Sequence, residues 1–156
     1  MPKSDIDDVI SKMQNHSFIT VHAGTTKSEI RRVLRVLKVR LPNNYIAFLL
    51  KCGWADINGD VLYGLGHKIA DRHSMFEQAL SESVDMQPPM PHRLIPLMSD
   101  GAGNHECLDT SKINGDDCPV VLWQHDHPRG ELQVPKRVSA SFTAWLAKKV
   151  REAPEV

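Results

Sequence analysis

The sequence has 156 residues, 41% hydrophobic and 24% charged, and its formal net charge at pH 7 is zero. This length suits one core, so we expect residues 1–156 to form a single domain. A neutral chain has no overall field that would hold nucleic acid or an anionic membrane, and we expect neither as a partner. No apolar run approaches the ~20 residues that a membrane helix needs.

The number and spacing of the cysteines indicate in which cellular compartment the protein is found. The three cysteines, Cys52, Cys107 and Cys118, are odd in number and widely spaced. This pattern is typical of free, buried thiols in a reducing compartment rather than of a disulfide framework. The N-terminus also lacks the apolar stretch and cleavage site of a signal peptide. We therefore expect a cytoplasmic protein whose thiols are all reduced.

Three short amphipathic helices are expected at the start of the chain. Apolar residues recur at helical spacing in the segments 6–13, 30–37 and 45–52. Residues that favour helix ends flank these segments: Ser4 with Asp7, Thr26 with Glu29, Leu41 with Pro42, and Gly53.

The pattern then changes from helices to strands. The turn signal Asn58-Gly59 precedes a strand near 61–65, and a fourth helix through Ile69, Phe76 and Leu80 ends before the proline-rich stretch 87–91. The segments that follow have strand composition and are separated by turn residues: 94–98, 106–109, 120–124 and 131–134. Pro96 predicts an edge position or a bulge in the first of these strands.

The chain closes with a helical stripe from Val138 to Val150, for which Ser139 or Ser141 is the expected N-cap. The expected order of elements, with helices first, then a strand meander and then a helix, indicates an α+β fold. We expect a largely antiparallel sheet of about four to six strands, flanked by helices.

The string Asp100-Gly101-Ala102-Gly103-Asn104 is glycine-rich, as phosphate-binding loops are. It lies between two expected strands, however, and lacks the helix N-terminus and lysine that such loops use. Gly101 and Gly103 suit a tight turn with positive φ, while Asp100 and Asn104 can bond their own backbone. We expect it to be the first turn of the meander and to bind no nucleotide.

A zinc site would need side chains such as those of His105, Cys107, His125 and His127. Their spacing matches neither a Cys-x-x-Cys nor a His-Glu-x-x-His pattern. Cys52 lies on the apolar stripe of the third expected helix, which favours a core residue over a nucleophile. We therefore expect no metal, no cofactor and no catalytic residue, although a small metal-dependent hydrolase is kept as an alternative.

Three tryptophans differ in their setting. Trp123 and Trp145 fall in phase with apolar neighbours and are expected in the core. Trp54 follows Gly53 and precedes a polar turn, where an aromatic side chain can be exposed and available to a partner.

Six strings occur in an order that resembles the SUKH superfamily, over about residues 26–150. They are Leu41-Pro42-x-x-Tyr45-x-x-Phe48-Leu49-Leu50-x-x-Gly53, Leu62-Tyr63-Gly64-Leu65, Ile95-Pro96 followed by Asp100 to Asn104, Cys107-Leu108-Asp109-Thr110, Pro119-Val120-Val121-x-Trp123-x-His125, and Ser141-Phe142-x-x-Trp145-Leu146. The sequence departs from the family after the third helix, where members commonly carry two glycines and Trp54 replaces the second.

The resemblance implies a non-enzymatic α+β protein. Its motif residues here are Pro42, Tyr45, Phe48, Gly53, Asp100, Gly101, Gly103, Asn104, Asp109, Trp123 and Trp145. The superfamily includes bacterial immunity proteins that bind and neutralise polymorphic or contact-dependent toxins, so a toxin domain such as a nuclease is the implied partner. The alternative is an intracellular regulatory scaffold of the fungal cell wall assembly regulator type, which usually carries long disordered flanks.

Charge is unevenly distributed along the chain. Residues 27–51 contain seven Lys or Arg and one acid, whereas residues 99–128 contain six acids and one Lys. Two solvated faces that neutralise each other would explain this pattern, and so would a charged surface for a partner.

The second explanation predicts particular contact residues. Asp116, Asp117 and Asp126, with Trp54 as an aromatic anchor, are the candidates for contact with the positive cleft of a nuclease toxin. Reversing Asp116 and Asp117 to Lys is then expected to slow binding without unfolding the domain. The competing surface is the basic second helix with Arg31 and Arg35, which would meet an acidic partner.

Overall fold

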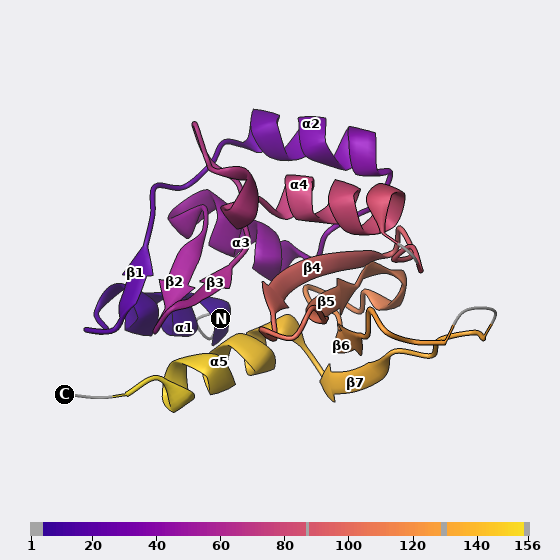
Figure 1. Cartoon of the computed structure of the whole chain (residues 1–156). Coiled ribbons are helices and arrows are strands. Elements are labelled where there is room, and N and C mark those ends of the chain that lie inside the picture. Colours follow the sequence, from indigo (N-terminus) through magenta and orange to yellow (C-terminus); the bar gives the residue numbers. More distant parts are fainter. Residues whose placement is uncertain (1–4, 87, 129–130, 155–156) are drawn as a thin grey trace.

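The computed structural model describes residues 5–86, 88–128 and 131–154 (Figure 1). Five α-helices and seven strands occur in these residues, with three short helical segments of other types. In chain order the elements are α1 (Asp5–Gln14), β1 (Ile19–Val21), α2 (Lys27–Leu37), α3 (Asn43–Cys52), β2 (Ala55–Ile57), β3 (Asp60–Leu62), the 3₁₀-helix η1 (Asp71–His73), α4 (Met75–Leu80), the π-helix η2 (Ser81–Asp85), β4 (Leu94–Ser99), β5 (His105–Asp109), the 3₁₀-helix η3 (Thr110–Lys112), β6 (Val120–Trp123), β7 (Lys136–Ser139) and α5 (Phe142–Glu152).

The first three helices form where the sequence predicts them. In α1 the buried residues are the predicted apolar stripe, while the expected cap Ser4 lies outside the described residues. Thr26 accepts a hydrogen bond from the backbone N–H of Glu29 at 3.1 Å and begins α2. Pro42 is the N-cap of α3, and Gly53 ends that helix with a φ of 69°.

The fourth helix is shorter than predicted. Ile69 precedes α4, which begins at Met75 with Ser74 as its N-cap. The next turn, Ser81–Asp85, is a π-helix that turns Glu82 into the protein interior. Apolar spacing could not reveal this change, because a π-turn needs only one extra residue per turn.

The antiparallel strands are divided between two sheets with the strand orders β1-β2-β3 and β4-β5-β6-β7. Asn58 and Gly59 both have positive φ and join β2 to β3, which confirms the predicted hairpin turn. The sequence did not predict β1 and β2, since three residues are too few for a periodic signal.

The turn between β4 and β5 is the predicted glycine-rich string. Oδ1 of Asp100 accepts hydrogen bonds from the backbone N–H groups of Ala102 and Asn104, at 2.8 and 3.1 Å. Gly101 and Gly103 have φ values of 84° and 92°. The prediction of a strand-to-strand turn is confirmed, and so is the bulge near Pro96, where the register between β4 and β5 shifts.

The predicted strand 131–134 is wrong, because the fourth strand of this sheet is β7, five residues later. The side chain of Gln133 instead bonds the backbone N–H and C=O of Gln124, at 2.9 and 3.0 Å. The amide side chain of Gln133 thus replaces the backbone hydrogen bonds of a strand in this segment. Pro135 has no N–H to donate, and β7 begins only after it. Leu132 and Val134 alternate with polar residues as in a strand, but both are exposed.

The main core lies between the helices and one face of each sheet. It includes Tyr45, Phe48, Phe142 and Trp145, which are almost completely buried and pack ring against ring. A smaller cluster of Met90, Leu94, Cys107, Val121 and Trp123 covers the other face of the four-stranded sheet. Both tryptophan predictions for the core are therefore confirmed.

Helix α5 closes the fold along the lower side of Figure 1, where it packs against α1. Ser141, one of the two expected caps, accepts a hydrogen bond from the backbone N–H of Ala144 at 3.0 Å. All three cysteines are buried and free. None of the described helices is long and apolar enough to cross a membrane.

Candidate functional site

The acidic turn before β6 contains one structural carboxylate, that of Asp117. Its Oδ1 accepts hydrogen bonds from the backbone N–H groups of Cys118 and Phe142, at 2.8 and 2.6 Å. Its Oδ2 accepts from the N–H and the hydroxyl of Thr143, at 3.1 and 2.6 Å, and from Nδ2 of Asn44 at 2.9 Å. Asp117 thus ties α3 and the turn to the N-terminus of α5, where a negative charge is favoured.

This arrangement corrects part of the sequence interpretation. The side chain of Asp117 is partly buried and supports the fold, because its carboxylate bonds groups in α3 and α5. The expectation that reversal leaves the domain folded therefore applies to Asp116 alone. Asp116 is exposed and accepts one side-chain hydrogen bond, from Nδ2 of Asn43 at 2.8 Å.

Asp116 and Asp117 line a groove between α1 and α5 with a volume of about 500 Å³. Asp5 and Asp8 from the first turn of α1 also line the groove, so its lining includes four carboxylates. Among the described residues that line it, the single cation is Lys12, so carboxylates predominate in this part of the groove. Sequence reasoning missed Asp5 and Asp8, because about 110 residues separate them from the turn and only the packing of α1 on α5 brings them together.

Asp126 does not belong to this groove. It is exposed and follows β6, whereas Asp116 and Asp117 precede that strand. The neighbouring His125 has a structural role, since its backbone N–H and its Nδ1 lie 3.0 and 2.8 Å from Oδ1 of Asn104. A Cβ at Gly103 would lie 2.9 Å from the His125 ring, so the glycine turn packs directly on this imidazole.

Trp54 lies between two imidazole rings. Its ring centroid is 3.7 Å from that of His22 and 3.9 Å from that of His73, with interplanar angles of 6° and 14°. Burial, aided by the charge of Arg72, lowers the pKa of His73. The stack covers both faces of the indole, so Trp54 is half-buried and offers a partner its edge rather than a flat face.

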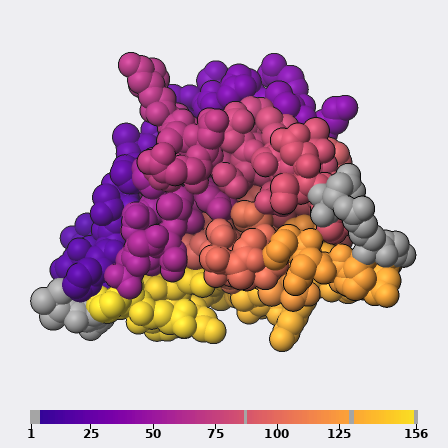
Figure 2. Space-filling view, viewed as in Figure 1, coloured from indigo at the N-terminus to yellow at the C-terminus, as the bar shows by residue number. Residues whose placement is uncertain are grey.

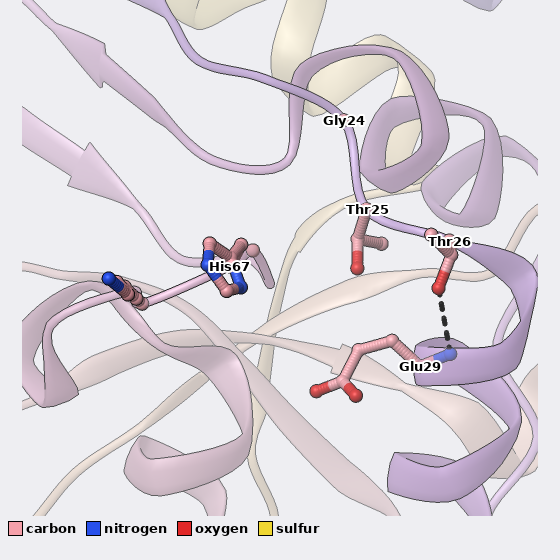
Figure 3. A pocket seen from close by; sticks show the side chains of 7 residues that line it. Gly24, Thr25, Thr26, Glu29 and His67 are labelled. Atoms are coloured by element: carbon pink, nitrogen blue, oxygen red, sulfur yellow. Dashed lines mark hydrogen bonds between the residues drawn. The ribbon is translucent and has the colours of Figure 1, made fainter.

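A cavity of about 360 Å³ lies between the segment that leads into α2 and residues 66–68 (Figure 3). Thr25, Glu29 and His67 line it from different segments. Arg32 donates two hydrogen bonds to the Glu29 carboxylate, and these bonds lower its pKa. Glu29 is already paired with Arg32, and Thr26 already caps α2. These two lining residues therefore serve the start of the helix.

Of the histidines considered for zinc, His105 and His125 have polar partners, whereas the buried Nε2 of His127 has no hydrogen-bond partner among the described residues. Nε2 of His105 lies 2.8 Å from Oε1 of Glu82, and both side chains are buried. Cys107 is fully buried in the smaller cluster, where burial raises its thiol pKa well above the ordinary value. Within the residues that the structure describes, no group of three or more His, Cys, Asp or Glu could hold a metal ion.

The motif residues are mostly structural. The hydroxyl of Tyr45 donates a hydrogen bond to the backbone C=O of Tyr63 at 2.8 Å. Buried Asp109 accepts from the N–H and the hydroxyl of Ser111, at 3.2 and 2.6 Å, and so caps η3.

These features define an α+β fold built from two antiparallel sheets, with an acidic groove between α1 and α5. Residues 24–148 match the model of the SMI1/KNR4 family (SUKH-1), so the chain belongs to this family. The match confirms the resemblance drawn from the six strings. Members of the family are generally non-catalytic binding domains, and a protein partner is therefore expected.

Proposed function

We propose that this protein is an immunity protein that binds and neutralises a cognate toxin domain, without catalysis. The observation that carries the proposal is the acidic groove, in which Asp5, Asp8, Asp116 and Asp117 surround a cavity of about 500 Å³. Family membership supports a binding role, and the groove supplies a concave surface on which carboxylates outnumber cations. Such a surface attracts a partner with the opposite charge and restricts the orientations in which it docks.

The partner's binding surface should be rich in Arg or Lys. A toxin that cleaves nucleic acid has such a surface, because its substrate cleft must hold phosphates. Inserting a cationic side chain of the toxin into the groove would cover that cleft and neutralise the toxin. Trp54 and Asp126 lie outside the groove's lining and are not part of the proposed contact.

The basic face of α2 is the competing surface. Arg31 and Arg35 are exposed there, whereas Arg32 is paired with Glu29. This face is a convex helix surface and would suit an acidic partner. The two surfaces thus predict opposite charges on the toxin, and mutations can distinguish them.

Association kinetics with a cognate toxin domain would test the proposal. The groove variant combines Asp5→Asn with Asp116→Lys and leaves the structural Asp117 unchanged. The matched variant combines Arg31→Glu with Arg35→Glu on exposed positions of α2. Each is measured at low and at physiological salt, after circular dichroism has shown that both variants fold.

We expect the groove variant to associate about tenfold more slowly at low salt and to lose most of its salt dependence. The α2 variant should associate at the wild-type rate. Slower association of the α2 variant alone would refute the groove as the binding site. Failure of the wild-type protein to restore growth to cells that express the toxin would refute the immunity function and favour the regulatory scaffold.

A further inference from the structure

A second, smaller cavity of about 140 Å³ opens beside β7 and shares no lining residue with the acidic groove. Three cationic side chains line it, those of Arg93, Lys112 and Arg137. The carboxylate among its lining residues is that of buried Asp109, whose Oδ1 lies 3.8 Å from Nε of Arg93. The lining therefore carries an excess of positive charge.

Exposed apolar side chains occur in the segment 132–138, which also contributes lining residues to this cavity. Leu132 and Val134 are 89% and 82% exposed, the highest values among the large hydrophobic residues that the structure describes. Val134 also lines the cavity, and Val138 in β7 is exposed as well. In Figure 2 the orange segment that carries β7 lies along the lower edge of the molecule. Apolar and cationic side chains close together at a surface are typical of a protein contact.

We propose that Arg93, Lys112, Val134 and Arg137, called here the β7 patch, bind a short acidic segment of another protein. A carboxylate of this segment enters the cavity and pairs with the three cations. Apolar residues that flank the carboxylate contact Leu132 and Val134. This second binding surface does not rest on the proposed toxin contact, because it has the opposite charge and different residues.

A second copy of the chain fits the β7 patch poorly. Pairing two β7 strands through Lys136 and Arg137 would bring these cations of one copy close to those of the other, and like charges close together are unfavourable. The strand is also short, follows Pro135 and is bulged relative to β6. These features oppose edge-to-edge pairing of strands. Charge complementarity therefore favours a different protein with an acidic segment.

Titration of the ¹⁵N-labelled full chain with the capped peptide Val-Glu-Val-Glu-Val tests the proposal by NMR. The peptide Val-Gln-Val-Gln-Val has the same shape without charge and serves as the matched ligand. Arg137→Glu and Lys112→Gln alter two exposed cations of the patch, and Lys27→Glu on α2 is the control variant. Two separate patch variants keep the test valid if one of them perturbs the fold.

We expect chemical shift changes at residues 109–112 and 134–138 with the acidic peptide. The uncharged peptide and each patch variant should bind about tenfold more weakly, while Lys27→Glu should bind like the wild type. Equal binding of the two peptides, shift changes confined to other elements, or no change at about 1 mM peptide would overturn the proposal. Concentration-dependent self-association that protects the β7 amides would also overturn it, by assigning the patch to a second copy.

Discussion

At the scale of single residues, carboxylates that look alike in the sequence have different roles. Asp116 and Asp117 are adjacent, yet Asp117 bonds groups in α3 and α5, while Asp116 remains exposed beside Asn43. A partly buried carboxylate that accepts several hydrogen bonds is costly to remove, because its donors lose their partners.

Replacement of these two residues should therefore have unequal effects. Asp117→Ala is expected to lower the free energy of unfolding by about 2–4 kcal/mol, through the loss of a helix cap and of charged hydrogen bonds. Asp116→Ala should change it by less than about 0.5 kcal/mol. Urea denaturation of both variants would measure the difference. Similar losses for the two variants would contradict the capping role.

The thiols provide a second prediction at this scale. Burial raises the pKa of Cys52 from 9.0 to about 11 and that of Cys118 to about 12, and it also raises the pKa of Cys107. Because only a thiolate attacks a disulfide reagent, all three should react slowly with Ellman's reagent at pH 8 in the native protein and rapidly in urea. Fast reaction of any thiol in the folded chain would contradict its burial.

The same shifts predict a loss of stability in alkali. Above pH 9.0 the unfolded chain releases thiol protons that the native protein retains, so the free energy of unfolding falls as pH rises. The loss should begin near pH 9 and continue through about pH 11. Substituting Cys52 by Ala should reduce this pH dependence, which denaturation at several pH values would measure.

At the scale of elements, close backbone contacts fix how the end of α3 meets the segment that follows β3. A Cβ at Gly64 would lie 1.7 Å from the backbone oxygen of Gly53, which ends α3. The same oxygen accepts a hydrogen bond from the N–H of Leu65 at 3.0 Å. Only glycine allows this approach, since any side chain would separate the two segments.

Gly64→Ala should consequently be strongly destabilising. We expect a loss of about 3 kcal/mol, because neither backbone can move without breaking its hydrogen bonds. Gly66→Ala is the control, since a Cβ there meets nothing within 4 Å. Thermal unfolding of both variants would check this, and equal melting temperatures would show that the backbone contact can relax.

At the scale of the whole molecule, one chain of hydrogen bonds connects α3 to both sheets. The hydroxyl of Tyr45 donates to the backbone C=O of Tyr63, and the N–H of Tyr63 donates to the C=O of Leu97 in β4 at 2.8 Å. Tyr63 directly follows β3, so these bonds join the three-stranded sheet to the four-stranded one. Burial also raises the pKa of Tyr45, which keeps its hydroxyl protonated as a donor.

Tyr45→Phe removes this donor and little else. The buried C=O of Tyr63 would lose its bond to the hydroxyl, so we expect a loss of about 1–2 kcal/mol in the free energy of unfolding. Hydrogen exchange should show faster exchange at the Tyr63 amide, where the sheets meet. A variant as stable as the wild type would mean that the hydroxyl does not couple the sheets.

The sequence by itself determined the elements that depend on local interactions. Thr26, Ser141 and Gly53 lie at helix ends because a side chain or a glycine satisfies nearby backbone groups there. The turns at 58–59 and 100–104 form for the same reason. The ordered strings also identified the family, since most of them contain core and turn residues that the fold needs.

Tertiary structure alone decided the division into two sheets, the displacement of the last strand to Lys136–Ser139 and both candidate surfaces. The acidic groove combines the first turn of α1 with the turn before β6, and the β7 patch combines residues from 93 to 137. Such residues meet because long-range packing buries apolar faces, and their separation in the chain leaves no local pattern. For the same reason only the fold could show that Asp117 caps α5 while its neighbour Asp116 faces solvent.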